Sequence, residues 1–415
     1  MKRFFATILA AAIVAIGAYS ISADKNTNEL VGTGFPKELD GTMMPYDFSK
    51  CDTAVPWGDS LQPVYVNYVA RHGARFLSSE NKIDKLRKKL LKARSEGRLT
   101  DKGTAFLDLI HRVDSTTDGR WGALNACGIA EEQRLGDELA KTCPRLLKYG
   151  RVEARATYVP RVVMTMYQFC HSLARYSSKL EISAVDGLQF NHILRFFETD
   201  TDYIRYLSDG PWKYAYDSFY EKTVPVRPAS LLTDEVTDAD KLRDMTMKMY
   251  AILQSLRAAG LQADASQWFS EEEYRRCWEV SNLKHYYQRS ANSFSDIPAQ
   301  AAAPLLDSIN AAAKRAFDVA DMAAGSDGAV GGRNPLRASL WFGHAETVMP
   351  LFALMRLPGC YAPDALSDRV ADVWKDQEVS PLGANLLIVY LRSNTGRRYA
   401  ALRLNGRWMP LSDFK

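Results

Sequence analysis

The sequence predicts an α/β fold, in which a sheet domain flanked by helices is interrupted by a mostly helical insertion. Two observations along the 415-residue chain support this prediction. Apolar runs typical of strands alternate with helix-like stretches in two separate regions, roughly 63–180 and 339–404. Between these regions, apolar residues recur at helical spacing over 241–259, 271–288 and 301–323. We therefore expect a discontinuous sheet domain with helices inserted between its two halves.

The expected domain boundaries follow from this alternation. The sheet domain takes residues 24–180 together with 311–415, and the helical insertion takes residues 181–310. The sequence shows neither a low-complexity linker nor an internal repeat between them. The chain length is sufficient for one large domain or two smaller ones.

The first 23 residues have the composition of a secretory signal peptide. Lys2 and Arg3 precede an apolar run over residues 4–21, and small residues follow the run. A membrane anchor is the alternative, because the run is close to the roughly 17–20 residues that span a bilayer. We expect export to the periplasm, the cell surface or the medium, with no stable membrane anchor after residues 1–23 are removed.

Charge and cysteine content narrow the class of ligand. The formal net charge is +4, and removal of the leader with Lys2 and Arg3 halves it. A nucleic-acid-binding domain is usually strongly basic, so we expect no nucleic-acid partner. A polyanionic small molecule would instead need a local basic pocket. The six cysteines fit an exported protein, but none forms a Cys-x-x-Cys pair and their pairing cannot be chosen from sequence.

The most informative motif is Arg71-His72-Gly73-Ala74-Arg75, which follows the strand-like run 64–70. A histidine at a strand end can act as a nucleophile on phosphorus, and arginines can hold phosphate oxygens and neutralise their charge. The ends of parallel strands are also where open α/β sheets bind ligands. If His72 attacks through one ring nitrogen, a backbone carbonyl should hold the other and fix the tautomer.

Two later segments repeat this arrangement. His344-Ala345-Glu346 follows the strand-like run 340–342 and precedes an apolar, helix-like stretch over 348–357. In the middle of the chain, Pro160 suits the first position of a helix. Arg161 then falls in the first turn, where backbone N–H groups favour an anion. All three segments therefore place phosphate-binding side chains where a strand ends or a helix begins.

Together the three segments resemble the histidine phosphatase superfamily, in its acid phosphatase and phytase branch (branch 2). The resemblance covers roughly residues 63–404, with Arg155-x-Thr157-x-x-x-Arg161 as the middle motif. His344-Ala345-Glu346 is similar to the form found in multiple inositol polyphosphate phosphatases, as are the stretches 194–197 and 383–387. The first motif is one residue shorter than usual. The lysine that many relatives carry soon afterwards is not in its usual place, and Lys82 is the nearest base.

The resemblance implies a histidine-phosphatase-like sheet domain with the active site in a cleft that the helical insertion shapes. His72 is then the nucleophile and Glu346 the proton donor. The phosphate-binding residues implied are Arg71, Arg75, Arg161 and His344, with Arg155 and Lys82 as possible further substrate contacts. No cofactor and no metal are expected, because nearby arginines would repel a cation that His72, His344 and Glu346 could otherwise hold.

The implied activity is hydrolysis of inositol hexakisphosphate (phytate) and lower inositol polyphosphates by an exported phosphomonoesterase, through a phosphohistidine intermediate. A broad acid or sugar phosphatase of the same fold is one alternative. A catalytically inactive polyanion-binding protein is another. Glu346 could also be a helix N-terminal carboxylate with only an electrostatic role. The other histidines, including His285, are interpreted as surface or packing residues, and the lysine-rich stretch 81–94 as a solvated helix face.

Overall fold

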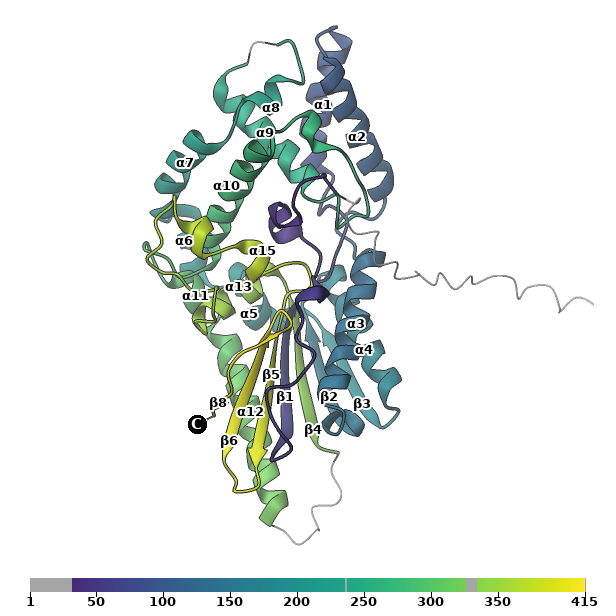
Figure 1. Ribbon diagram of the computed structural model, residues 1–415, viewed down its shortest axis with the longest axis vertical. Helices are drawn as coiled ribbons and strands as arrows, with labels where there is room; N and C mark the ends of the chain where they lie inside the picture. The colour runs from purple at the N-terminus through teal and green to yellow at the C-terminus, as the bar shows by residue number, and fades with distance from the viewer. Residues whose placement is uncertain (1–31, 236, 326–333, 415) are drawn as a thin grey trace, which may run out of the picture.

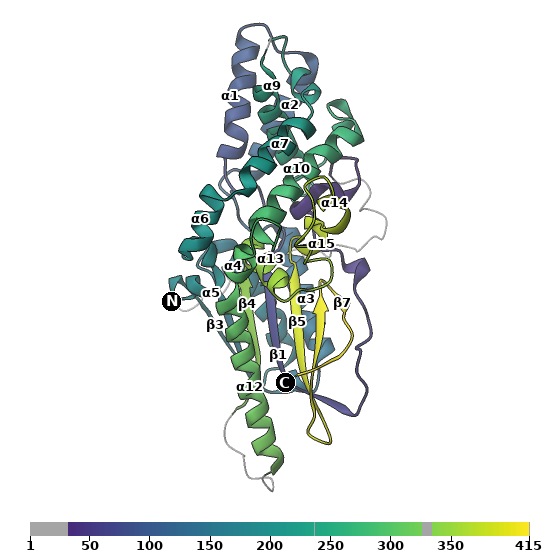
Figure 2. The same ribbon diagram turned by 90° about the vertical axis from the view of Figure 1, so that its left-hand side faces the viewer.

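The computed structural model describes residues 32–235, 237–325 and 334–414. The predicted signal peptide, residues 1–23, lies outside them. The described residues form a lower layer built around a sheet and an upper, entirely helical part, which Figures 1 and 2 show one above the other. No helix among the described residues is both long and apolar enough to cross a membrane.

Eight strands of the described chain form one mixed sheet. They are β1 (Leu61–Arg71), β2 (Gly150–Ala156), β3 (Leu180–Asp186), β4 (Leu336–Gly343), β5 (Asn385–Ser393), β6 (Arg398–Leu404), β7 (Arg407–Trp408) and β8 (Ser412–Asp413). Their order is β3-β2-β4-β1-β5-β6-β7, with β8 also paired to β6. Strands β3, β2, β4 and β1 run parallel, whereas β5 and β6 are antiparallel to their neighbours. The carboxyl ends of β1 and β4 therefore lie side by side.

Both faces of the sheet are covered, because the side chains of β1 alternate between two apolar clusters. Val66 and Tyr68 pack with the helices α3 (Ala126–Thr142) and α4 (Pro160–Tyr176) on one face. Tyr65 and Val69 pack on the other face, mainly with α12 (Ala303–Gly325) and α13 (Ala345–Leu354). Successive side chains of β1 point to opposite faces of the sheet, and both faces are covered, so the strand is buried on both sides. Figure 2 shows α12 running along the sheet.

The helical part joins two segments that are distant in sequence. Helices α1 (Asn81–Ser95) and α2 (Asp101–Thr117) share an apolar cluster with α9 (Ala239–Leu253) and α10 (Glu271–Arg289). A capping box between Ser270 and Glu273 begins α10. The remaining helices are α5 (Asn191–Leu194), α6 (Thr201–Asp209), α7 (Trp212–Thr223), α8 (Arg227–Ser230), α11 (Ile297–Gln300), α14 (Val370–Val373) and α15 (Asp376–Val379). Short 3-10 helices occupy Lys37–Met43, Phe48–Lys50, Leu146–Lys148, Leu188–Phe190, Phe196–Glu198 and Ala265–Gln267.

The predicted α/β class with flanking helices and a helical part is confirmed, and the segment limits differ from the expected ones in three places. The sheet continues through β3 to Asp186, beyond the expected boundary at 180. Helices α1 and α2 belong to the helical part although they precede that boundary. Helix α9 ends at Leu253, before the predicted 259, and turns follow it up to Gly260. All six cysteines are free thiols, and four of them are buried.

Candidate active site

A cavity of about 660 Å³ lies between the carboxyl ends of β1 and β4 and the helical part. Its sheet side carries Arg71, His72 and Arg75, together with His344 and Glu346. Its helical side is lined by α1, α7, α9 and α10, which contribute Lys82, Tyr216, Tyr220, Asp244, Tyr250, Lys284, His285, Gln288 and Arg289. The three sequence motifs lie far apart in the chain, yet they meet at one strand-end cavity, as open α/β sheets favour.

His72 is the first residue after β1 and is only 3% exposed. Its Nδ1 lies 3.0 Å from the carbonyl oxygen of Gly73, and a carbonyl can only accept, so Nδ1 carries the proton. This is the restraint expected from the sequence, and it leaves Nε2 with a free lone pair. Burial lowers the pKa of His72 well below its usual value, and the charges of Arg71 and Arg161 lower it further. The imidazole is therefore neutral and fit to act as a nucleophile.

The loop after His72 is pressed against helix α3. A Cβ on Gly73 would lie 3.0 Å from the carbonyl oxygen of Gly128 and 2.9 Å from Oε1 of Glu132, so no larger residue fits without displacement. The amide of Ala74 donates to Oε2 of Glu131 at 2.8 Å. The other oxygen of Glu131 accepts from the amide of Tyr46 at 3.0 Å. A buried carboxylate thus connects the nucleophile loop to the N-terminal segment.

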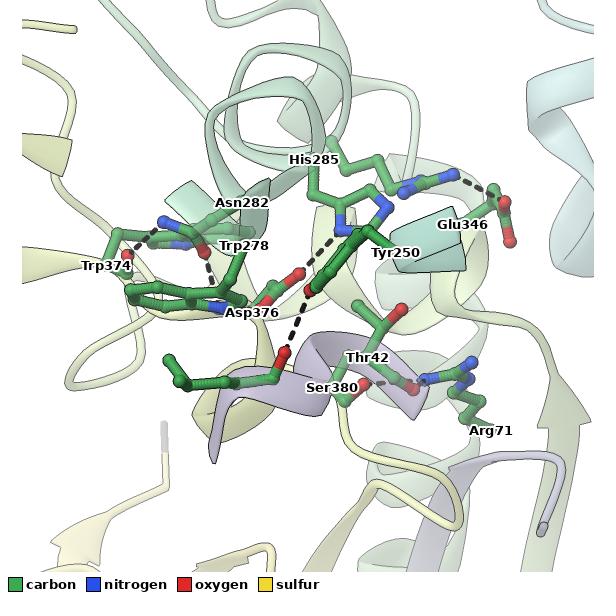
Figure 3. A network of polar contacts seen from close by, with 12 residues as sticks. Thr42, Arg71, Tyr250, Trp278, Asn282, His285, Glu346, Trp374, Asp376 and Ser380 are labelled. Carbon is green, nitrogen blue, oxygen red and sulfur yellow. Dashed lines mark hydrogen bonds and ion pairs between the residues drawn. The ribbon is translucent and has the colours of Figure 1, made fainter. Parts of the chain in front are cut away.

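Arg71 and Arg75 bring positive charge into the cavity, and neither forms an ion pair with a carboxylate in the described part of the chain. Arg71 Nη1 donates to the carbonyls of Thr42 and Ser380 at 2.7 and 2.6 Å, as Figure 3 shows. Arg75 Nη1 donates to the carbonyl of Phe76 at 2.9 Å. Burial and a neighbouring arginine together lower the pKa of Arg71 to about 9 and that of Arg75 to about 10, against the charge of Glu346. A bound anion would relieve this repulsion.

Arg161 completes the positive side of the site from helix α4. Pro160 is the first residue of α4, as predicted, and this places Arg161 in the first turn. The Arg161 side chain lines the cavity, and burial lowers its pKa. Within the described residues, Arg71, Arg75 and Arg161 form no ion pair with a carboxylate. Three arginine side chains thus direct positive charge toward a polar cavity, and this arrangement suits the binding of a phosphate.

His344 follows β4 and faces His72, with 5.8 Å between the two ring centroids. Its Nε2 lies 2.9 Å from Nη1 of Arg195 and 3.2 Å from Oγ1 of Thr157. Because arginine can only donate, Nε2 accepts and the proton of the neutral ring lies on Nδ1. Burial and the charge of Arg161 lower the pKa of His344 to about 3, although the charge of Glu346 acts in the opposite direction. The neutral ring can therefore donate a hydrogen bond to a phosphate oxygen.

Glu346 lies in the first turn of α13, two residues after His344. Arg289 Nη2 donates to its Oε1 at 2.6 Å, a contact drawn in Figure 3. Burial would raise the pKa of the Glu346 carboxyl, but the positive charges of Arg289 and Arg71 oppose it, and the pKa is held well below its usual value. Glu346 is therefore ionised in the free protein, and it can donate a proton only after its surroundings change.

The two further basic residues named from sequence have different positions. Lys82, in the first turn of α1, lines the cavity, and its pKa is lowered by burial and by the charge of Arg75. Arg155, near the end of β2, does not line the cavity. Its Nη2 lies 2.6 Å from Oε2 of Glu153 and its guanidinium stacks on the ring of Trp341. The structure thus brings Lys82 to the site and leaves Arg155 engaged elsewhere.

Several residues at the site, among them Arg195, Thr157, Arg289 and His285, were not predicted from sequence as site residues. Arg195 and Thr157 orient His344, Arg289 pairs with Glu346, and His285 lines the cavity while bonded to Asp376. Arg195 and Thr157 stood inside stretches that resemble the family, and this was the available signal. Arg289 and His285 lie in an amphipathic helix without any local motif. His285, interpreted from sequence as a surface or packing residue, lines the cavity.

The described residues contain no group of three His, Cys, Asp or Glu side chains placed to hold a metal ion. What the geometry offers is a neutral histidine with one free nitrogen, a second neutral histidine, several arginines without carboxylate partners, and a carboxylate near the reacting position. These groups can attack a phosphoryl group, hold its oxygens and exchange a proton with a leaving oxygen.

Comparisons with known proteins agree with this description. A family model, the histidine phosphatase superfamily (branch 2), matches residues 64–405. Two structures of the multiple inositol polyphosphate phosphatase of Bifidobacterium longum, complexed with inositol hexasulfate and with phosphate, align with TM-scores of 0.73 and 0.71. Each is 15% identical and covers 90% of this chain and 93% of its own. The phytase of D. castellii aligns with a TM-score of 0.64 at 14% identity, covering 95% of this chain and 84% of its own. No curated protein sequence matches.

Proposed function

The chain belongs to branch 2 of the histidine phosphatase superfamily, and we propose that it hydrolyses inositol hexakisphosphate and lower inositol polyphosphates through a phosphohistidine on His72. One observation carries the proposal. The free Nε2 of a neutral His72 opens on a cavity of about 660 Å³ that holds buried arginines without carboxylate partners. Such a cavity favours a phosphorylated ligand at the position where the histidine can attack it.

In the first half of the reaction, Nε2 of His72 attacks phosphorus in line and the bond to the ester oxygen breaks. The electron pair of that bond goes to the leaving oxygen, which takes a proton from Glu346. Arg71, Arg75 and Arg161 hold the oxygens of the transferred group, together with His344. Their guanidinium groups are in place before reaction, so they stabilise the transition state without reorganising.

Glu346 must gain a proton before it can donate one. In the free protein Arg289 keeps it ionised. A bound polyanion offsets the charge of Arg289 and surrounds the carboxylate with negative charge, and both effects raise its pKa. Substrate binding thus raises the pKa of Glu346, so that the carboxyl can be protonated and act as the proton donor. An inositol oxygen is a poor leaving group and depends on that proton.

In the second half, water attacks the phosphohistidine. The carboxylate of Glu346 accepts a proton from the water, the N–P bond breaks, and its electron pair returns to Nε2 of His72. The products are inorganic phosphate and the free enzyme. The scheme calls for no metal or organic cofactor, because the arginines supply the positive charge that phosphoryl transfer needs.

The cavity holds more positively charged side chains than one phosphoryl group needs, and this surplus favours substrates that carry several phosphates. Lys82 and Lys284 line the helical side of the cavity, and Arg289 is held at its edge by Glu346. We propose that the helical part shapes this cleft and that the chain is exported, as the composition of residues 1–23 indicates.

The test is phosphate release from inositol hexakisphosphate by the purified chain without residues 1–23, in EDTA, beside a His72→Ala variant. We expect release by the wild type and a loss of at least about 10³-fold in the variant, since the nucleophile is absent. Thermal melting verifies that the variant is folded. Release of phosphate from p-nitrophenyl phosphate, but not from the inositol phosphate, would point to the broad phosphatase instead. No release from either would point to a protein that only binds polyanions.

A further inference from the structure

His285 and Asp376 form a hydrogen-bonded pair on the helical side of the cavity. Nδ1 of His285 lies 2.7 Å from Oδ2 of Asp376, whose side chain is fully buried. The other carboxylate oxygen accepts from Nε1 of Trp278 at 3.0 Å, and the backbone amide of Asp376 donates to Asn282 at 2.8 Å. Asn282 in turn donates to the carbonyl of Trp374 at 3.0 Å. Figure 3 shows this network converging on Asp376, which is therefore fixed in place.

The other edge of the His285 ring is available to a ligand. His285 lines the cavity, its side chain is 19% exposed, and its Nε2 has no hydrogen-bond partner among the described residues. Because the carboxylate of Asp376 accepts from Nδ1, the free lone pair of the neutral ring lies on Nε2. One turn further along α10, Arg289 reaches Glu346. Helix α10 thus brings His285 and Arg289, beside Lys284 and Gln288, to the cavity from the side opposite the strand ends.

We propose that His285, as an imidazolium supported by Asp376, binds a phosphate of the substrate other than the one that reacts with His72. The inference rests on the proposed function in one respect, namely that the substrate carries more than one phosphate. Within the part of the chain that the structure describes, His285 forms no hydrogen bond with His72 or Arg71, and in Figure 3 its ring lies apart from Arg71. Its place on the helical wall suits a phosphate distant from the nucleophile.

The binding step is a balanced proton uptake. One proton from solvent adds to Nε2, which then donates a hydrogen bond to a phosphate oxygen while Nδ1–H still donates to Asp376. In the free protein burial lowers the pKa of His285, and the charge of Arg289 lowers it further against the pull of Asp376. A phosphate beside the ring adds negative charge and raises that pKa, so ligand binding and protonation promote each other.

Other charged and titratable groups line the same cavity and bear on this equilibrium. Those on the helical elements are Lys82, Tyr216, Tyr220, Asp244, Tyr250, Lys284 and Arg289, and those on the sheet side are Arg71, His72, Arg75, Arg161, His344 and Glu346. Cations predominate, and Asp376 is the carboxylate bonded directly to the ring. A polyanion is therefore the ligand that can both bind here and compensate a new positive charge on His285.

The experiment is calorimetric titration of the full chain with myo-inositol hexakissulfate. The sulfates do not take up protons near neutrality, so any proton bound on complex formation goes to the protein. Titrations in buffers with different ionisation enthalpies give the number of protons taken up. For His285→Gln we expect about tenfold weaker binding, from the loss of one charge-assisted hydrogen bond, and a proton uptake at pH 7 that is lower than in the wild type.

Three variants complete the test. His111→Gln removes an exposed histidine on α2 and should bind as the wild type does. Asp376→Asn keeps the side-chain shape but removes the supporting charge, so it should reduce proton uptake in the same direction as His285→Gln. Glu346→Gln measures the protons that Glu346 takes up, so that they are not attributed to His285. Thermal melting of each variant separates unfolding from a specific loss.

Equal proton uptake and equal affinity in the wild type and in His285→Gln would overturn the inference. Absence of any binding by the wild type would overturn it too. The proposed reaction is judged separately by phosphate release from inositol hexakisphosphate. A further outcome is that the wild type releases no phosphate, while its proton uptake on binding still exceeds that of His285→Gln. The reaction would then be refuted, and the role of His285 in polyanion binding would be supported.

Discussion

The two walls of the cavity hold their polar side chains in different ways. On the strand-end wall, Arg71, His72 and His344 are each 3% exposed, and the first two are held by backbone carbonyls. On the helical wall, His285 and Arg289 are more accessible and are each held by one carboxylate side chain. A side chain bonded to backbone carbonyls is held by the main chain around it, whereas one bonded to a carboxylate side chain can respond more readily to a ligand. In the proposed function the chemistry belongs to the strand-end wall, and the recognition of further phosphates belongs to the helical wall.

Glu346 connects the two walls, and its removal should give the largest selective effect. In Glu346→Gln no proton can be given to the leaving oxygen. We expect kcat for inositol hexakisphosphate to fall by roughly 10²–10⁴-fold, the usual contribution of general acid catalysis. The aryl leaving group of p-nitrophenyl phosphate needs little protonation, so its kcat should fall by less than about tenfold. Steady-state kinetics on both substrates measures the split. An equal loss on both would assign Glu346 an electrostatic role only.

The rigidity of the strand-end wall depends in part on Glu131, which can be tested through stability. Burial raises the pKa of Glu131 to about 7, although the amides of Ala74 and Tyr46 lower it. The folded state therefore binds a proton that the unfolded state releases near its ordinary value of 4.5. Between these two values the wild type loses stability as pH rises. Removing the group should remove that loss.

In Glu131→Gln we expect the free energy of unfolding to depend less on pH. The wild type should lose on the order of 3 kcal/mol more than the variant between pH 4.5 and pH 8, from the size of the pKa change. Urea unfolding at both pH values measures the difference. An unchanged slope in Glu131→Gln would mean that Glu131 is not the group that titrates.

These residues show how far the sequence could predict the site. His72 and its two flanking arginines were predictable because a strand end places a short motif directly in the cavity. Glu346 was predictable for the same reason, since it follows β4 by three residues. Arg289 was not, because its contact with Glu346 crosses 57 residues. In sequence it is one base among several in an amphipathic helix, and only tertiary packing selects it.

The fold was predictable to a similar extent. Alternating apolar runs gave the strands, since each buried strand needs them whatever it packs against. The association of α1 and α2 with α9 and α10 depends on which apolar faces meet, and periodicity within one helix does not encode its partner. The strand β3 was placed outside the expected sheet domain because it lies at the edge of the sheet and only one of its faces packs on the core. Leu180, Ile182 and Ala184 make that contact and alternate with exposed residues.

The ion pair between Arg289 and Glu346 predicts a smaller change, in pH dependence. The charge of Arg289 lowers the pKa of Glu346, against burial. In Arg289→Met that pKa should rise, so the protonated donor persists to higher pH. We expect the descending limb of the kcat–pH profile for inositol hexakisphosphate to move upward by about one unit. Arg289→Lys keeps a positive charge and should leave the limb near its wild-type position. A limb that does not move in Arg289→Met would show that another group controls it.

The smallest effect is expected at Arg155, and its comparison with Arg161 tests which arginines face the substrate. The two lie in one motif, yet Arg155 is paired with Glu153 and stacked on Trp341, whereas Arg161 lines the cavity. Arg155→Met should change kcat/KM for inositol hexakisphosphate by less than about twofold, as expected for a partly exposed ion pair. Arg161→Met should reduce it by about 10²-fold, as for loss of one donor to a transition-state oxygen. Comparable losses in the two variants would show that Arg155 turns toward the bound substrate, and the sheet side of the cavity would then extend to the end of β2.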